Sequence, residues 1–368
     1  MSSRRAPAAR ADSSVSRPAN SRNEQLQIVD ALDFRFVRAS QCPAEMVQEI
    51  VNFLDNQNTS HPFQFPQWAD EGTYLAWFRR KAELRWFAQC GVFYPAGRIL
   101  SPIRGLTLNR GPVCDDLNLT EVGLRRLVEV GSQKGFAFID IAPEWTSDFA
   151  SSALDMLRRQ GWRPLSAGRS SLRLDLSPDL DQLLGSFRKV ARYEIRRSQR
   201  QGLEVRMARD ETDRDHWLRL YLEMAKKKGF VADDSAHMRQ VLLWLRAEAD
   251  RGGLFLAHKK DGTPLGGIVI VRAGARCWYV WGATSKEDKS SAGHLLHWRA
   301  IQWAKEKGCR EYDFGGYRED TGGGTAFFKR GFCDHVVHFL PSQRQIIKGT
   351  RVRISDLVSK FRSRLRIS

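Results

Sequence analysis

The chain has 368 residues, of which 42% are hydrophobic and 10% aromatic, and it carries a net charge of +17. This composition supports packed cores and excludes a wholly disordered chain. The length predicts two domains of ordinary size. No run reaches the roughly 18 consecutive apolar residues that a membrane-spanning helix requires, so we expect no transmembrane helix.

The excess of positive charge lies mainly at the two ends of the chain. Residues 1–23 hold five arginines against one aspartate, and residues 344–368 hold eight Lys and Arg residues against one aspartate. The net charge of +17 therefore divides into +4 and +7 at these ends and +6 between them, which does not establish a nucleic-acid-binding core. We interpret 1–23 as a disordered basic arm, with an organellar transit peptide as the alternative. This arm has no apolar signal segment, so we expect a cytoplasmic chain.

The six cysteines form no CxxC pair and no close cluster with histidine. Such a pattern indicates neither a disulfide framework nor a zinc site. We expect reduced thiols, as in the cytoplasm, and no metal.

Hydrophobic periodicity and turn residues predict the elements of the first half. Gly135 ends one helix, because glycine readily adopts the left-handed conformation that helix ends favour. We expect helices over Pro43–Leu54, Thr120–Gln133 and Asp148–Gln160, and strands over Trp86–Val92, Ile99–Arg104 and Phe136–Ile141.

The second half opens with an alternating strand and a helix start. Ser177 as N-cap, Pro178 at the first helical position and the early acid Asp179 predict a helix that runs to about Arg200. Further helices are expected over Asp213–Lys227, Ala236–Ala249, Ala292–Glu306 and Thr325–Arg330, and strands over Ser171–Leu176, Leu254–His258, Gly267–Arg272, Cys277–Trp281, Glu311–Phe314 and His335–Leu340.

The two halves repeat each other at an offset of about 170 residues. Lys134-Gly135 precedes a strand that contains Asp140, and Lys307-Gly308 precedes one that contains Asp313. Each strand is followed by a helix and a Gly-aromatic pair. The pattern predicts a duplicated α/β (α+β) unit, and the antiparallel meander with a crossover helix is the order of a GNAT fold. We expect one GNAT-like domain over 24–165, a second over 166–343 and a basic amphipathic tail over 344–368.

Four sequence elements carry a resemblance to a known family. The elements are Arg110-Gly111-Pro112-Val113 followed by Asp115, an Arg-rich helix with Arg188, Arg192 and Arg196, the run Tyr312-Asp313-Phe314-Gly315-Gly316, and Phe328-Lys329-Arg330-Gly331-Phe332. Together they resemble the FemABX peptidyltransferases over roughly residues 60–340. The resemblance implies transfer of an aminoacyl group from aminoacyl-tRNA to an amine of a peptidoglycan precursor, without a cofactor. It also implies that Arg110 lies in the substrate-binding groove.

Lys329 is the residue that the resemblance places nearest the reaction. A fixed cation in a dry site would stabilise the oxyanion of acyl transfer. The alternative is a solvated lysine on a short helix, which the equivalent Arg159 of the first half supports.

The other candidates each have a structural alternative. Arg188, Arg192 and Arg196 recur every four residues, so they form either a track for pyrophosphate or tRNA phosphate or a solvated helix face. Lys227 stands where the family more often carries arginine, and we assign it to substrate binding.

Acidic and aromatic candidates complete the expected site. Asp115 is a candidate to hold or deprotonate the attacking amine, and a turn role is its alternative. Asp313 and Gly315 at a strand end are expected to face the ligand, or else to serve the fold. Tyr279 is expected to point away from its tryptophan neighbours and to face a cleft.

Two other functions remain open at this stage. One is an acyl-CoA-dependent N-acyltransferase of surface polysaccharide or lipid, although Ser290-Ser291-Ala292-Gly293 is a poor pyrophosphate loop. The other is a non-catalytic scaffold. The tail 346–368 has apolar residues at helical spacing among arginines, so it either contacts an anionic membrane surface or packs on the second domain.

Overall fold

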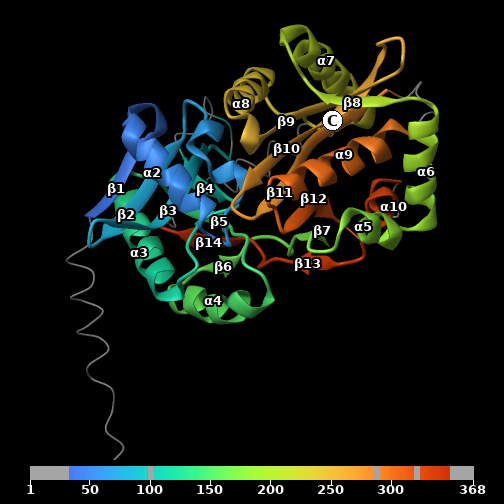
Figure 1. The fold of residues 1–368 in the computed structure, drawn as a ribbon. Coiled ribbons are helices and arrows are strands. Elements are labelled where there is room, and N and C mark those ends of the chain that lie inside the picture. The colour runs from blue at the N-terminus through green and yellow to red at the C-terminus, as the bar shows by residue number, and fades with distance from the viewer. Residues whose placement is uncertain (1–32, 96, 98–102, 286–290, 319–323, 349–368) are drawn as a thin grey trace, which may run out of the picture.

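The computed structural model describes residues 33–95, 97, 103–285, 291–318 and 324–348. Two seven-stranded mixed sheets stand side by side, each flanked by helices (Figure 1). The first sheet has the order β1-β2-β3-β4-β5-β14-β6, and the second has the order β13-β7-β12-β11-β10-β9-β8. The expected tandem GNAT-like α/β architecture is confirmed.

The strands of the first sheet are β1 (Asp33–Arg38), β2 (Tyr74–Arg80), β3 (Glu83–Phe93), β4 (Gly105–Asn109), β5 (Phe138–Ala142), β6 (Arg163–Pro164) and β14 (Gln343–Ile346). Those of the second are β7 (Ser170–Asp175), β8 (Glu204–Met207), β9 (Gly252–His258), β10 (Pro264–Ala273), β11 (Arg276–Thr284), β12 (Glu311–Tyr317) and β13 (Val336–His338).

The helices are α2 (Ala44–Asp55), α3 (Leu117–Gln133), α4 (Ser147–Arg159), α5 (Leu180–Ser186), α6 (Lys189–Arg200), α7 (Glu211–Lys228), α8 (Ser235–Ala247), α9 (Ala292–Glu306) and α10 (Gly324–Arg330), with 3-10 turns at Ala39–Gln41, Pro62–Gln64, Pro66–Trp68 and Ala249–Arg251. Within the described ranges, each helix is too short or too polar to cross a membrane.

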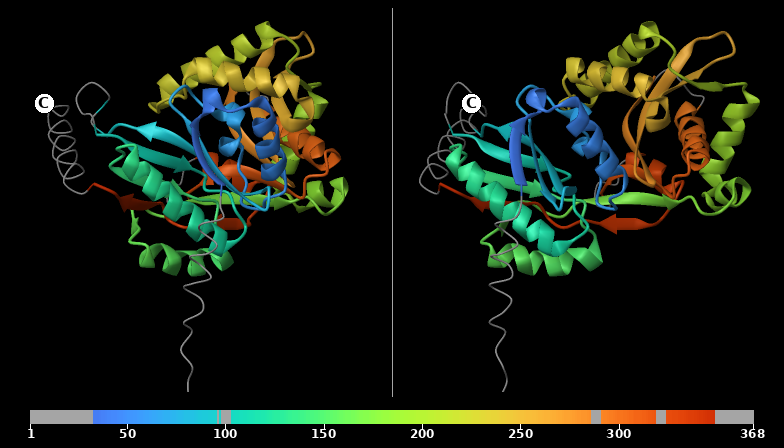
Figure 2. Two further views of the ribbon diagram at one scale, coloured as in Figure 1. Left: turned by 90° about the vertical axis from the view of Figure 1, so that its left-hand side faces the viewer. Right: turned by 60° about the vertical axis from the view of Figure 1, so that its left-hand side comes forward.

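Each sheet contains a strand that directly follows a strand of the other sheet along the chain, because β7 follows β6 and β14 follows β13, and in this sense the two sheets exchange a strand. β14, from the end of the chain, lies between β5 and β6 of the first sheet, and β7, which follows the first half, takes the matching place between β12 and β13 of the second. Figure 2 shows the strands at the end of the chain, in red, crossing beneath both halves. The expectation that residues 344–368 form a separate tail is therefore wrong for 344–346, which complete the first sheet. The remainder from 349, like the arm 1–23, lies outside the described residues.

A shared core holds the halves together. One cluster of buried residues includes Ile50 and Phe87 from the first half and Trp217, Leu254 and Trp278 from the second. Burial of apolar surface across this boundary stabilises the relative position of the sheets.

One helix expected in the second half is two helices. Phe187 has an extended backbone, with φ −65° and ψ 151°, between α5 and α6. Its ring is buried against Trp298 and Phe332, so the break places an aromatic side chain in the core. The N-cap is Asp179, which forms a capping box with Gln182, and not the predicted Ser177.

Other expected boundaries also differ. The strand expected at Ile99–Arg104 falls mostly outside the described residues, and the strand found there begins at Gly105. The expected helix over Ala292–Glu306 matches α9 at both ends.

Strands β11 and β12 separate at the centre of the second sheet. They pair in parallel only from Arg276 to Trp278 on β11, where Trp278 lies opposite Asp313. A bulge leaves Val280 without a partner on β10, because Val269 pairs with Trp281 and Ile270 with Tyr279. Beyond Trp278 of β11 and Asp313 of β12, the backbone N–H and C=O groups on the facing edges of these two strands do not pair with each other.

Candidate active site

Lys329 lies in the last turn of α10, beside the separated strands. Its side chain is buried, and its Nζ donates a hydrogen bond of 2.7 Å to the carbonyl oxygen of Gly316. Burial lowers the pKa of this amine from 10.5 to about 8, and the charge of Asp313 opposes the shift. The alternative of a solvated surface lysine is therefore wrong.

Tyr279 and Gly315 complete the surroundings of this cation. The Lys329 Nζ lies 5.8 Å from the centre of the Tyr279 ring, within range of a cation–π interaction. Tyr279 packs against a second buried cluster, within the second half, that includes Tyr312 and Phe314, whereas Trp278 and Trp281 pack with the shared core. Regular alternation would place Trp281 on the side of Tyr279, and the bulge at Val280 turns it away. Burial raises the pKa of Tyr279 to about 12, so its hydroxyl is neutral near pH 7.

Asp313 holds the backbone of this corner in place. Its carboxylate accepts a hydrogen bond of 2.8 Å from the Gly315 N–H and another from the Ser171 hydroxyl, and it pairs with the Arg173 guanidinium at 2.8 Å. Gly315 has φ +70°, and a Cβ there would lie 3.2 Å from the Tyr279 carbonyl oxygen, so glycine suits this position. Both oxygens of this carboxylate are bonded to protein groups, so the role of Asp313 is to position the backbone around Gly315.

An ion network links this corner to the Arg110 loop. Glu144, which follows β5, pairs with Arg110 at 2.7 Å, Arg169 at 3.1 Å and Arg173 at 3.5 Å. Burial raises the pKa of Glu144, against the charges of Arg110 and Arg173. The series Arg110–Glu144–Arg173–Asp313 therefore runs from the first half to the second.

Glu144 and Arg173 were missed by sequence reasoning. Arg173 stands on the polar side of the alternation in β7, where Leu172 and Leu174 form the apolar side. That polar side would face water in an isolated domain, but here it faces the other half, because β7 lies where the two sheets meet. A charged residue inside a strand was the available signal.

Asp115 does not lie with Lys329. Its carboxylate accepts hydrogen bonds from the backbone N–H groups of Asn58 and Thr59, at 2.8 and 3.1 Å, and from the Thr59 hydroxyl at 2.8 Å. It lines a different cavity, of about 740 Å³, between α2 and the start of α3. The catalytic role expected for Asp115 is corrected to its structural alternative, which is to fix a turn.

The arginines of the expected phosphate track have separate roles. Arg188 is the N-cap residue of α6 and pairs with Asp334 at 2.6 Å. Arg192 donates to the carbonyl oxygens of Gly185 and Phe187, and so ties α6 to the end of α5. Arg196 is exposed. The single arginine face predicted from spacing is therefore wrong, because the helix break changes the position of Arg188.

Lys227 lies in the exposed last turn of α7, next to Lys226 and Lys228. It stands on another element from Lys329. Among the described residues, it makes no hydrogen bond or ion pair with the network around Glu144.

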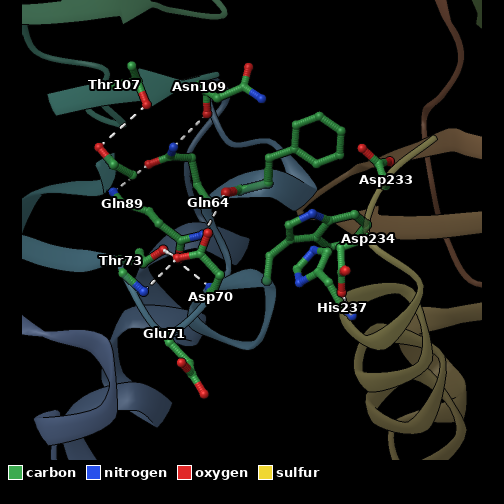
Figure 3. A pocket seen from close by; sticks show the side chains of 14 residues that line it. Gln64, Asp70, Glu71, Thr73, Gln89, Thr107, Asn109, Asp233, Asp234 and His237 are labelled. Atoms are coloured by element: carbon green, nitrogen blue, oxygen red, sulfur yellow. Dashed lines mark hydrogen bonds between the residues drawn. The ribbon is translucent and has the colours of Figure 1, made fainter. Parts of the chain in front are cut away.

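A cavity of about 630 Å³ opens between the first sheet and the start of α8 (Figure 3). Phe63 and Trp68 contribute aromatic rings, and the carboxylates come from Asp70, Glu71, Asp233 and Asp234. The described residues that line it include neither lysine nor arginine.

The wall of this cavity is ordered by two glutamines. Gln64 donates to the Asn109 carbonyl oxygen at 2.7 Å and accepts from the Gln89 N–H at 2.8 Å. Gln89 donates to the Phe63 carbonyl oxygen at 3.0 Å, and its own buried Oε1 has no partner in the structure. An open acceptor at a cavity wall suits a ligand N–H.

Strand β11 connects the cavity to the Lys329 corner. The Trp281 Nε1 donates to Asp233 at 2.6 Å, and its ring lies 5.1 Å from that of Trp68. The same strand directs Tyr279 toward Lys329. No group of three or more His, Cys, Asp and Glu side chains is arranged to hold a metal ion in the described part of the chain.

Comparisons with known proteins find relatives of similar sequence and fold. Residues 185–330 match the model of the acetyltransferase (GNAT) domain family. The chain is 25% identical over 155 residues to a UDP-N-acetylmuramoylpentapeptide-lysine N(6)-alanyltransferase of Weissella viridescens, covering 42% of this chain and 45% of that protein. It is 32% identical over 62 residues to a lipid II:glycine glycyltransferase of Staphylococcus haemolyticus, covering 17% of this chain and 15% of that protein. The matched segments thus span less than half the length of these relatives.

The fold is similar to that of a solved structure of FemX, with a TM-score of 0.72 at 18% identity, over 84% of this chain and 98% of that one. It is also similar to L-PGS from Bacillus licheniformis, with a TM-score of 0.53 at 11% identity, over 85% and 96% of the two chains.

Proposed function

We propose that the chain, which is similar to FemABX proteins in parts of its sequence and in its fold of two GNAT-like halves, is an aminoacyltransferase acting on a peptidoglycan precursor. In the proposed reaction an amine of the precursor attacks the ester carbonyl of an aminoacyl-tRNA. The new C–N bond forms, the ester C–O bond breaks, the tRNA hydroxyl leaves and the amine loses a proton. Direct attack needs neither a covalent enzyme intermediate nor a metal.

The buried cation of Lys329 is the observation that carries the proposal. Acyl transfer places negative charge on the carbonyl oxygen, and a fixed positive charge in a dry site stabilises it. Removal of one such group typically costs about 3 kcal/mol in barrier height. The Gly315-Gly316 backbone, held by Asp313, keeps Lys329 beside the open edge of β12.

The cavity between the first sheet and α8 is the proposed acceptor site. An amine enters as a cation, and the four carboxylates and two aromatic rings of this cavity favour a positive charge. β11 runs from Trp281, whose indole contacts Asp233 of this cavity, to Tyr279 beside Lys329, so the proposed amine would enter from this side.

The donor side is proposed to lie over α6. This helix exposes Lys189, Arg196 and Arg200 around the exposed ring of Tyr193. Arginine and lysine bind RNA phosphates, and an aromatic ring can stack on an unpaired base.

Transfer of labelled amino acids tests the proposal. Purified protein would be incubated with radiolabelled aminoacyl-tRNAs and precursor, and the product measured with the original chain, with Lys329→Met and with the control Lys307→Met. Lys307 pairs with Asp250 at the surface, so the control changes the same residue type without entering the site. We expect a large loss with Lys329→Met alone. Transfer from no aminoacyl-tRNA, or equal transfer by both variants, would contradict the proposal.

A second candidate function is acyl transfer from acyl-CoA, which the match of residues 185–330 to an acetyltransferase domain favours. Native mass spectrometry of the protein with acetyl-CoA and with aminoacyl-tRNA separates the two. A stable complex with acetyl-CoA, together with acetylation of an amine acceptor, would replace the proposed donor.

A further inference from the structure

The connection between α7 and α8 exposes apolar side chains at the surface. Val231 is 97% exposed and Phe230 41%, and Leu222 on the last turns of α7 is 36% exposed. With Lys226, Lys227 and Lys228, these residues form what we call the α7–α8 tip. Figure 1 shows α7 and α8 on the outer edge of the molecule, away from the crossing strands. Single exposed apolar residues are ordinary, but here two consecutive ones follow three consecutive lysines.

The tip carries three lysines against one exposed acid on the same part of α7, Glu223, which lies one turn before Lys226 and Lys227. The three lysines are exposed on the last turn of α7, which ends at Gly229 with φ +70°. Among the acids, Asp233 accepts from the Trp281 indole at 2.6 Å, and Asp234 caps α8 through the N–H groups of Ala236 and His237. These two carboxylates are therefore engaged with the protein, so the three exposed lysines outweigh Glu223 and leave the tip positively charged beside Phe230 and Val231.

We propose that the α7–α8 tip docks on an anionic lipid surface. Apolar side chains beside lysines are the combination that binds the boundary of a bilayer, where the rings and methyl groups enter the acyl region and the amines contact lipid phosphates. The charge of the tip favours this occupant, because an apolar protein partner would gain nothing from three adjacent cations.

The tip borders the proposed acceptor cavity. Asp233, Asp234 and His237, which line that cavity (Figure 3), begin two residues after Val231. Docking of the tip would therefore hold the mouth of the cavity near the membrane. We infer that the acceptor is linked to a lipid and not to a soluble nucleotide, and this part rests on the proposed function.

Binding to vesicles tests the docking without any turnover. The full-length protein would be floated with vesicles of phosphatidylglycerol and phosphatidylcholine, and with vesicles of phosphatidylcholine alone. We expect binding only to the anionic vesicles, and a fall of about ten-fold when Phe230→Ser and Val231→Ser are combined. The control is Leu243→Ser, which removes an apolar side chain that is 54% exposed on α8, and it should bind as the original chain does.

A dye at the tip separates docking of the tip from binding by other basic segments. An environment-sensitive fluorophore on Val231→Cys should shift to the blue with anionic vesicles, and the same fluorophore on Leu243→Cys should not. Absence of flotation, or equal emission of the Val231→Cys dye with and without vesicles, would overturn the proposal. Loss of self-association in the double variant, without an effect on vesicles, would assign the tip to a second copy of the chain instead.

Transfer to the two kinds of acceptor tests the inference about the substrate. The double variant should lose transfer to a vesicle-embedded lipid-linked precursor and keep transfer to a soluble one. Equal loss on both would overturn the inference about the lipid-linked acceptor. Failure of the unaltered chain on both would contradict the proposed function and leave the vesicle result standing.

Discussion

Arg173 of β7 stands between Glu144 of the first half and Asp313 of the second, with distances of 3.5 Å to the Glu144 Oε2 and 2.8 Å to the Asp313 Oδ2. All three side chains are buried. Asp313 in turn holds the Gly315 N–H, and the next carbonyl oxygen accepts from Lys329. The proposed reaction centre therefore depends on a contact that neither half makes alone.

Replacement of Arg173 by Met should destabilise the protein strongly. The change leaves the buried carboxylates of Glu144 and Asp313 short of a partner, and loss of one member of a buried ion pair costs about 3–5 kcal/mol. Urea unfolding would measure it. The control Arg239→Met breaks the exposed pair with Asp215 and should cost under about 1 kcal/mol. Equally small losses of unfolding free energy in the two variants would show that the buried ion pairs of Arg173 do not stabilise the fold.

The pH dependence of stability should report the burial of Lys329. Its pKa falls from 10.5 to about 8 in the folded protein, so the unfolded chain binds more protons between these values. Stability of the original chain relative to Lys329→Met should therefore rise as the pH increases from about 8 toward 10.5, and the difference should be constant below about 8. A flat difference over this window would contradict a buried amine.

The rate of aminoacyl transfer should fall as the pH rises above about 8, where Lys329 loses its proton. Above about pH 8 Lys329 becomes neutral, and the oxyanion then loses its positive partner. We expect the single-turnover rate of the original chain to fall above this pH, and the low residual rate of Lys329→Met to show no such fall. Matching profiles would remove Lys329 from the reaction.

Asp115→Ala should act on stability and not on chemistry. Loss of its hydrogen bonds leaves the partly buried N–H and hydroxyl of Thr59 unsatisfied, at a cost of about 1–3 kcal/mol, whereas the exposed N–H of Asn58 can bond to water. The rate of transfer with saturating substrates should stay close to that of the original chain at a temperature where both are folded. A large fall in that rate with unchanged stability would restore the catalytic role.

Glu71→Gln should weaken the acceptor. Glu71 is exposed at the cavity between the first sheet and α8, and removal of its charge lowers the attraction for an entering cation. We expect KM for the acceptor to rise about three-fold or more, with less effect at high salt. The control is Glu83→Gln, which changes the other, 740 Å³ cavity. Equal effects of the two variants would argue against the acceptor assignment.

Much of the second half could be predicted from its sequence because its elements have strong local signals. The apolar pattern of α9 and the Gly308 stop define a helix without reference to the rest of the chain. The Asp that follows each Lys-Gly stop correctly indicated duplication, and each is met by an arginine from the neighbouring strand, with Asp140 opposite Arg344 and Asp313 opposite Arg173.

What could not be predicted depends on contacts between distant segments. The break at Phe187 is set by the aromatic rings around it, and the arginine spacing alone gave no sign of it. Asp115 was assigned a role from its neighbours in sequence, whereas its partners, Asn58 and Thr59, lie far away along the chain. The site is assembled where two sheets meet, and periodicity within one strand does not report which surface the strand will face.

Loss of the Arg344 side chain should destabilise the first sheet. Arg344 forms two bonds, of 2.6 and 2.7 Å, with the Asp140 carboxylate across β14 and β5. We expect Arg344→Ala to cost about 2 kcal/mol, measured by thermal unfolding, whereas the exposed Arg200→Ala should change little. An unaltered unfolding temperature would mean that the Arg344–Asp140 pair does not stabilise the first sheet.

The exchange of β7 and β14 makes the protein resemble a swapped dimer whose two copies are fused into one chain. A protease cut in the exposed segment 165–168 would not release two separate domains. The N-terminal fragment would hold β1 to β6, whereas β14, which lies between β5 and β6, would belong to the C-terminal fragment. The nicked pieces should stay interlocked on a sizing column and unfold in one transition. We therefore expect neither half to fold when expressed alone, and a substitution that destabilises one sheet should lower the stability of the other sheet as well.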